Sequence, residues 1–265
     1  MNKLNKKELE NLESTFTRIQ KNVEDGIKKL NITPPIRVAK VWKRNLGGGG
    51  KSISITGDTI EKAAVNYSSI SGKKLPDSSI ALKIKSTSNK FRAMGVSAIS
   101  HPMNPFCPTS HMNVRIFIEL GKNNIIENWW IGGGFDLTPF FPTKEESARW
   151  HSNAKKCVDT FGSKYYKKFA KNCDDYFYLP HRKEKRGIGG IFFDQLQHQN
   201  IEESLVMLEE ISKCYIETYA ELVNNNKKHK FTAEDREFQL YRRGRYVEFN
   251  LLFDRGTKFG IESNG

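Results

Sequence analysis

The segment HMNVRIFI, residues 111–118, decides the fold because its chemistry alternates with every residue. Successive side chains of a β-strand point to opposite faces of the sheet. One face of this strand would be apolar and able to pack on a core: Met112, Val114, Ile116 and Ile118. The other would carry His111, Asn113 and Arg115, with Phe117 beyond them. An acid–base group, an amide and a permanent cation on one rigid strand can bind an anionic ligand, although an ordinary strand with polar residues facing water gives the same pattern.

Further strands surround this one in the first half of the chain. We predict them at 37–42, in hairpin-like segments up to about residue 70, and at 94–99, 112–120, 125–131 and 187–193. Residues 72–77 and 86–89 have the composition of loops. Helical periodicity covers 6–30, 143–161, 163–175, 201–223 and 232–242. Residues 246–253 alternate between apolar and polar, which favours another strand.

Strands joined by hairpin-length connections, followed by helices, favour an α+β fold with a largely antiparallel sheet. No internal repeat is present, and no stretch rich in Pro, Gly or Ser marks a domain boundary. We therefore predict a single catalytic domain over residues 1–265, with its N-terminal helix at about 6–30.

Composition limits the class of protein. The chain carries 43 Lys and Arg against 30 Asp and Glu, a net charge of +13, which suits nucleic acid and small anionic ligands equally well. No stretch approaches the roughly 20 apolar residues of a membrane helix. The charged N-terminus lacks the apolar core of a signal peptide, and the four scattered cysteines are typical of reduced thiols. We expect a cytoplasmic protein without an integral membrane segment.

A glycine-rich segment, WWIGGGFDLTP, spans residues 129–139. Its three glycines, Gly132–Gly134, give a backbone that a flat ligand or another chain can approach closely. A plain turn would show the same glycines, and a phosphate-binding loop is disfavoured because the P-loop pattern is absent. Asp136 follows at once. A carboxylate beside this glycine-rich, aromatic segment would lie in a region of reduced dielectric, where its pKa can be shifted.

Two further sets of residues leave alternatives open. Four histidines occur in motif-like contexts and could ligate a metal, but none has a metal-binding spacing: His101, His111, His151 and His181. Arginines interleaved with aromatic residues near 174–194 and 242–246 could hold nucleic acid, or a flat ligand with several carboxylates. No nucleic-acid-binding motif supports the first of these.

Taken together, these segments resemble oxygen-dependent coproporphyrinogen III oxidase, an enzyme family of haem biosynthesis. The matching motifs occur in order from about residue 36 to the end of the chain: FRAMGVS from Phe91, HPMNPFCPTSHMNVR from His101, WWIGGGFDLTP from Trp129, CDDYFYLPHR from Cys173, RGIGGIFFD from Arg186 and RRGRYVEFNLLFDRGTKFG from Arg242.

The resemblance implies a large flat antiparallel sheet sandwiched between helices, assembled as a homodimer. It also implies that O2 oxidatively decarboxylates two propionate groups of coproporphyrinogen III to vinyls, giving protoporphyrinogen IX, CO2 and hydrogen peroxide. Neither flavin, haem nor nicotinamide is implied, and neither is nucleic acid as a partner. A divalent metal cation is possible by resemblance, with His101, His111, His151 and His181 as the matching ligands.

Site residues follow from the same motifs. The resemblance makes His111 the proton donor, and it makes Asp136 the acid that holds the pyrrole N–H groups or accepts a proton. Substrate contacts fall on Ser97, Asn113, Val114, Arg115, Asn264 and Gly265. Arg115 would fix the departing carboxylate. We expect Asp136→Asn to cause a large fall in turnover with little change in melting temperature.

Two points depart from the family pattern. Ala64 stands where the family usually has glycine. The family also continues with a further strand and helix beyond Gly265, so we expect this chain to be a fragment or a compromised enzyme. A basic, aromatic RNA- or anion-binding module without catalysis is therefore kept as a second hypothesis.

Overall fold

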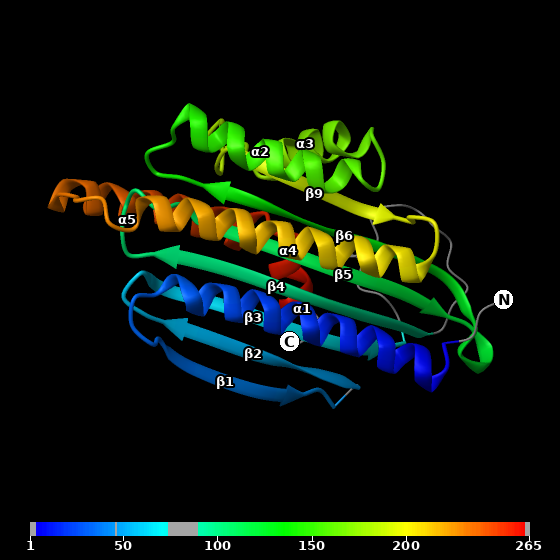
Figure 1. The fold of residues 1–265 in the computed structure, drawn as a ribbon. Helices are drawn as coiled ribbons and strands as arrows, with labels where there is room; N and C mark the ends of the chain where they lie inside the picture. Colours follow the sequence, from blue (N-terminus) through cyan, green and yellow to red (C-terminus); the bar gives the residue numbers. More distant parts are fainter. Residues whose placement is uncertain (1–3, 46, 74–89, 263–265) are drawn as a thin grey trace.

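A seven-stranded antiparallel sheet forms the middle layer of the molecule in a computed structural model that describes residues 4–45, 47–73 and 90–262 (Figure 1). In spatial order its strands are β1 (Ile36–Lys43), β2 (Gly48–Thr56), β3 (Ile60–Gly72), β4 (Lys90–Pro102), β5 (Thr109–Leu120), β6 (Ile126–Thr138) and β9 (Gly189–Leu196). A separate two-stranded ribbon pairs β7 (Tyr178–Leu179) with β8 (Glu184–Lys185). Asn264, Gly265 and most of the predicted loops at 72–77 and 86–89 lie outside the described residues.

Helices cover both faces of the sheet, which confirms the α+β fold with a sheet sandwiched between helices (Figure 1). One face is covered by α1 (Lys6–Leu30), α2 (Lys144–Asp159), α3 (Tyr165–Tyr176) and α4 (Ile201–Asn226). Behind the sheet lie α5 (Ala233–Leu252) and α6 (Arg255–Glu262). A short 3-10 helix, η2 (Lys122–Asn124), lies between β5 and β6.

Helix α1 shows how periodicity places an element on the sheet. It begins with a capping box, in which the Asn5 side chain accepts a hydrogen bond from the backbone of Glu8 and the Glu8 side chain accepts one from the backbone of Asn5. Its buried apolar residues recur every three or four positions: Leu12, Phe16, Ile19, Val23, Ile27 and Leu30. This stripe joins the main core between the sheet and the four helices, so the predicted helix at 6–30 is confirmed.

Strand β5 lies near the centre of the sheet, between β4 and β6. Its four even-numbered apolar residues, 112 to 118, are fully buried in the main core, as the alternation predicts. Strand β6 is longer than predicted, because it continues through Gly132–Gly134 to Thr138. The glycines therefore lie inside a strand, which excludes the alternative of a plain turn there.

The predicted strand at 246–253 is wrong, because these residues form the second half of α5. A capping box of Thr232 and Asp235 starts this helix, and no proline interrupts it. Tyr246 and Phe249, which strict alternation would place on opposite faces, are both buried and three residues apart. Helical i, i+3 spacing therefore overrides the alternation.

Long polar side chains attach α5 to the edge of the sheet face that it covers. The Arg236 and Arg243 guanidinium groups contact the Glu61 carboxylate on β3 at 2.8 and 2.6 Å. Buried Gln239 donates a hydrogen bond to the carbonyl of Pro102 at 3.0 Å. Because these side chains reach across the gap between helix and sheet, space remains between the two layers.

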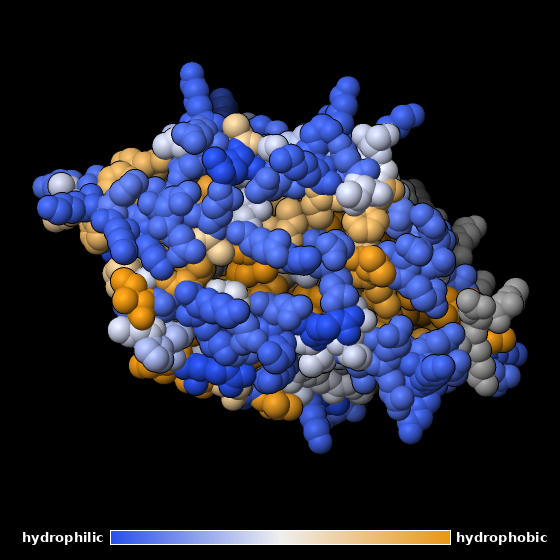
Figure 2. Space-filling view, viewed as in Figure 1, coloured by the Kyte–Doolittle hydropathy of each residue, from blue (hydrophilic) through white to orange (hydrophobic). Residues whose placement is uncertain are grey.

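The surface of the face that carries α1 and α4 is mainly hydrophilic (Figure 2). Figure 2 shows hydrophilic side chains along the outer helices of the face that carries α1 and α4, with hydrophobic residues in the grooves between them. Among the described residues no helix has the length and apolar character needed to cross a membrane. All four cysteines are free thiols, in agreement with the sequence.

Replacement by alanine should have opposite effects on stability at two glycines, Gly244 in α5 and Gly134 in β6. Gly244 is an exposed position inside α5 where an added Cβ meets no atom within 4 Å, so we expect Gly244→Ala to raise the free energy of unfolding by about 0.5–1 kcal/mol. Gly134 has φ +142°, and a Cβ there would lie 1.9 Å from the carbonyl oxygen of Ile191. Gly134→Ala should lower the free energy of unfolding by at least about 1 kcal/mol.

Urea denaturation of the two variants beside the parent chain measures both effects. A loss of stability in Gly244→Ala would contradict the helical assignment of residues 233–252. An unchanged midpoint in Gly134→Ala would contradict the close approach of β6 and β9.

Candidate active site

The polar face of β5 opens into a cavity of about 520 Å³ between the sheet and α5–α6. His111, Asn113 and Arg115 line it, and all three are half-buried. This confirms the predicted alternation of β5: the apolar face packs on the core while the polar face meets a space large enough for a ligand.

The sheet register arranges the cavity floor in rows that run across the strands. Four rows follow from the pairing of β3, β4, β5 and β6: Ala64–Ile99–His111–Asp136, Asn66–Ser97–Asn113–Gly134, Ser68–Gly95–Arg115–Gly132 and Ile70–Ala93–Phe117–Trp130. Alanine, serine and glycine occupy many of these positions. Few large side chains stand up from the sheet, so the floor suits a flat ligand.

Two glycines of β6, Gly134 and Gly132, are required by different neighbours. Gly134 lies on the cavity face, where β9 leaves no space for a side chain. At Gly132 an added Cβ would lie 3.0 Å from Nε of Arg115, so this glycine accommodates the guanidinium group. The predicted close approach at the glycines is thus made by β9 and by Arg115.

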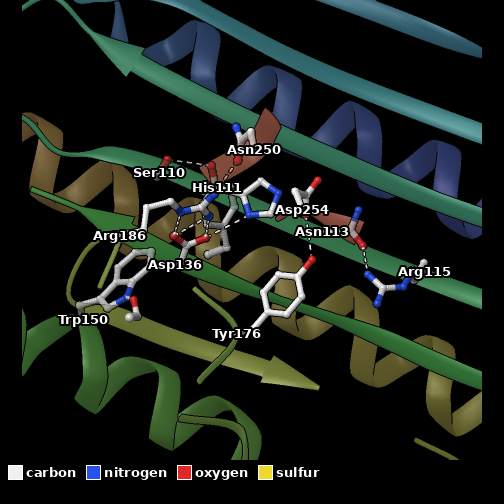
Figure 3. Close-up of polar contacts among 12 residues, drawn as sticks. Ser110, His111, Asn113, Arg115, Asp136, Trp150, Tyr176, Arg186, Asn250 and Asp254 are labelled. Atoms are coloured by element: carbon white, nitrogen blue, oxygen red, sulfur yellow. Dashed lines mark hydrogen bonds and ion pairs between the residues drawn. The ribbon is translucent and has the colours of Figure 1, made fainter. Parts of the chain in front are cut away.

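Asp136 is buried at the end of the first row, behind His111 (Figure 3). Its Oδ1 lies 3.0 Å from Nδ1 of His111. Both carboxylate oxygens accept hydrogen bonds from the Arg186 guanidinium group, at 2.6 to 3.1 Å. The Asp136 and Arg186 side chains are each only 2% exposed, so the charges neutralise each other in a dry environment.

Electrostatics keep this pair ionised. Burial alone would raise the pKa of the Asp136 carboxyl, but the charge of Arg186 and the hydrogen bond from His111 hold that pKa below its ordinary value. Burial would likewise lower the pKa of Arg186, and the charge of Asp136 raises it instead. An ionised carboxylate can only accept hydrogen bonds, so Nδ1 of His111 carries the proton that faces Asp136. The other ring nitrogen, Nε2, is then left for the cavity.

Arg186 is a functional residue that the sequence did not single out by role. Aromatic rings enclose its guanidinium carbon, with centroids 4.0 Å away at Phe177, 4.3 Å at Tyr246 and 4.9 Å at Phe249. Its Nη1 donates to Oδ1 of Asn250 on α5 at 2.8 Å. The mixture of charge and aromatic residues near 174–194 and 242–246 indicated this cluster, but not its partner Asp136.

Arg115 lies two rows away on the same face. Its Nη1 donates to Oδ1 of Asn113 at 2.8 Å, and its Nη2 lies 3.1 Å from Oδ1 of Asp194 on β9. Arg255 of α6 approaches the other oxygen of Asp194 at 3.2 Å. A cationic pair therefore shares one carboxylate at the cavity wall, a geometry that an incoming carboxylate can also enter.

The entrance to α6 adds a second acid near His111. Asp254 accepts hydrogen bonds from the Tyr176 hydroxyl at 2.9 Å and from the Thr257 backbone at 2.8 Å. Burial would raise the pKa of Asp254, but the charge of His111 and the bonds from Thr257 and Tyr176 keep it below its ordinary value. Sequence reasoning missed Asp194, Asp254 and Arg255 as site residues, because their acidic and basic groups converge only through the packing of β9 and α6.

The other residues predicted to contact the substrate lie in different surroundings. Ser97 lines the cavity beside Asn113, its register partner. Val114 is fully buried on the core face, so only its backbone can meet a ligand. Asn264 and Gly265 lie outside the described residues.

The four histidines proposed as metal ligands have separate surroundings. His101 contacts Thr109, His111 contacts Asp136, His151 bonds to Tyr166 and to the carbonyl of Ile188, and His181 bonds to Glu248. Within the described residues no group of three His, Cys, Asp or Glu side chains could hold a metal ion. The arrangement therefore does not fit a metal site shared by these four histidines.

Comparison with known protein families gives a match over nearly the whole chain. A family model described as Coproporphyrinogen III oxidase matches residues 11–265. The matched range contains all the cavity-lining residues named above.

The buried ion pair changes the prediction for Asp136. Asp136→Asn leaves the Arg186 cation buried without its counter-charge, so we now expect the free energy of unfolding to fall by about 3–5 kcal/mol instead of staying constant. Asp174→Asn is the matched control, because Asp174 pairs with Lys185 at the surface and its loss should cost less than about 1 kcal/mol. Urea denaturation measures both, and equal losses would show that burial of the pair is unimportant.

His101 predicts a pH dependence of stability. Burial, with the nearby charge of Arg243, lowers its pKa to about 4, below the value of about 6.5 in an unfolded chain. Between these values the unfolded state binds a proton that the folded state does not, so stability falls as the pH drops from about 6.5 to 4. His101→Gln should flatten this part of the profile, whereas His229→Gln, at an exposed position, should not. Parallel profiles for His101→Gln and the parent chain, from denaturation at several pH values, would exclude this contribution.

Proposed function

Because the chain belongs to the coproporphyrinogen III oxidase family, we propose that its cavity binds coproporphyrinogen III and that O2 oxidatively decarboxylates two of the propionate groups. The family acts in haem biosynthesis, and the ordered motifs from Phe91 to Gly260 support the oxygen-dependent branch. The products would be protoporphyrinogen IX, CO2 and hydrogen peroxide. The homodimer and the cytoplasmic location implied by the resemblance stay predictions.

Each decarboxylation must conserve atoms and charge. A propionate, one O2 and one proton give a vinyl group, one CO2 and one hydrogen peroxide. The bond from the carboxylate to its neighbouring carbon breaks, and a hydrogen leaves the carbon next to the ring with its electron pair, formally as hydride, to reduce O2. The protein must therefore hold a carboxylate, activate the electron-rich pyrrole and supply a proton.

Arg115 is suited to hold the carboxylate. Its planar guanidinium group lies on the cavity face, between Asn113 and Asp194, and is one-quarter exposed. A guanidinium group binds a carboxylate through two parallel hydrogen bonds and so fixes its orientation. The floor of small residues leaves room for the macrocycle, and the net charge of +13 would steer a ligand with four carboxylates toward the protein.

His111 is suited to exchange a proton with the substrate. Ionised Asp136 fixes the proton on Nδ1, so Nε2 can accept a hydrogen bond or a proton from a pyrrole N–H. Protonated His111 would then supply the proton that the reduced O2 requires. Asp136 has both oxygens engaged and lies behind the histidine, so we assign it to positioning and charge stabilisation and assign the direct base role to His111.

One observation carries this proposal. His111 and Arg115 face the same cavity from one strand, and the buried Asp136–Arg186 pair fixes the orientation of His111. No step is assigned to a divalent metal, because the four histidines do not form a shared ligand set. O2 enters as a co-substrate.

The direct test is to incubate the purified protein with chemically reduced coproporphyrinogen III in air. We expect O2 uptake, CO2 release and, after oxidation of the product, the fluorescence of protoporphyrin. The same mixture without O2 should give none of these. Binding of the substrate without turnover would support the second hypothesis, an anion-binding module.

Arg115 gives the sharpest variant. We expect Arg115→Ala to lower kcat/KM by about 30-fold or more, the equivalent of about 2–5 kcal/mol for a desolvated carboxylate contact. Arg115→Lys should recover only part of this, because an ammonium group lacks the planar fork. Arg149→Lys is the control, since Arg149 pairs with Glu221 on the helical face away from the cavity. Wild-type kcat/KM in Arg115→Ala would remove this residue from substrate binding.

A further inference from the structure

Two of the four thiols meet between α2 and α4, on the sheet face opposite the cavity. The Cys157 thiol donates to the carbonyl of Glu210, one turn before Cys214, at 3.6 Å. The Cys214 thiol lies 3.5 Å from the carbonyl of Asn153, one turn before Cys157. This reciprocal pattern places the two sulfur atoms in the same gap between the helices.

The other two thiols are a natural comparison. Cys107 and Cys173 are completely buried, and burial raises the pKa of the Cys107 thiol to about 12 and that of Cys173 far above its usual value. Such thiols are poor nucleophiles. Cys157 and Cys214 are only half-buried, so a small oxidant can reach them.

The closeness of the two thiols affects them unequally. It lowers the pKa of the Cys214 thiol and raises that of the Cys157 thiol. A thiol with a lowered pKa forms the thiolate more readily, and the thiolate is the nucleophile in thiol oxidation. This difference favours Cys214 as the attacking residue and Cys157 as the resolving one.

We propose that Cys157 and Cys214 are a redox pair, which a hydroperoxide converts to a disulfide between α2 and α4. The Cys214 thiolate attacks one oxygen of hydrogen peroxide, the O–O bond breaks, and hydroxide leaves with a sulfenic acid on Cys214. The Cys157 sulfur then attacks the Cys214 sulfur, and its proton leaves with the second water. Two thiols and one peroxide give one disulfide and two waters.

The bridge would close a loop that contains α3 and β9. This loop carries Arg186 and Asp194, which contact the site on the other side of the sheet. A cross-link restricts the unfolded chain, so the oxidised protein should melt several degrees higher than the reduced one. The proposed oxidase reaction would release the same oxidant beside this chain, but the pair needs only peroxide from any source.

The test adds one molar equivalent of hydrogen peroxide to the reduced protein and blocks the remaining thiols under denaturing conditions. Before blocking, we expect the oxidised chain to be about 2 Da lighter than the reduced chain, because a disulfide lacks the two thiol hydrogens. Peptide mapping should join the segments with Cys157 and Cys214 and leave Cys107 and Cys173 blocked. Dithiothreitol should restore all four thiols and the lower melting temperature.

Two variants separate the roles. In Cys157→Ser we expect a sulfenic acid that persists on Cys214 and reacts with dimedone. In Cys214→Ser, Cys157 should stay reduced at the same peroxide concentration. Circular dichroism checks that both variants fold. Sulfinic acid on either cysteine without a cross-link, or equal oxidation rates in the two variants, would overturn the proposal. Neither result bears on turnover of coproporphyrinogen III, so the two proposals fail independently.

Discussion

The buried contact between Asp136 and Arg186 is the interaction on which the site depends. It joins β6 to the segment that enters β9, and through Asn250 it reaches α5. Removing two charges from water is costly. Here the hydrogen bonds between the two side chains and the aromatic rings around Arg186 offset this cost. The same carboxylate orients His111. The ion pair that connects β6 to α5 therefore also fixes the orientation of His111.

The cavity exists because the two faces of the sheet are covered in different ways. On one face, the apolar sides of amphipathic helices pack directly on the strands and form the main core. On the other, α5 is held by long side chains such as Arg236, Arg243 and Arg186, which span the gap without filling it. The space that remains is lined by small floor residues and by cations that already share acidic partners. A ligand rich in carboxylates can enter by exchanging partners, without disturbing the core.

Sequence reasoning succeeded where one periodic rule governed a segment. The alternation of 111–118 gave β5 its two faces, and three- to four-residue spacing gave α1. It failed at 246–253, where alternation and helical spacing compete over eight residues, and the capping box at Thr232 with burial of Tyr246 and Phe249 decides for the helix. The glycines of β6 were expected to allow close approach, but the neighbours that require it, β9 and Arg115, are tertiary contacts that the sequence does not identify. Likewise His111 and Asp136 were both identified, but Arg186 could not be assigned to Asp136 without the fold.

The row register of the sheet has a consequence for how this protein can change over evolution. His111 and Arg115 share a face because an even number of peptide units separates them. One residue inserted between them would turn one of the two into the apolar core. Two inserted residues would restore the face but move Arg115 by about 7 Å along the strand, beyond the reach of Gly132 and Asp194. Loops such as the one around η2 can vary in length, whereas the strands that carry the site can vary only by substitution.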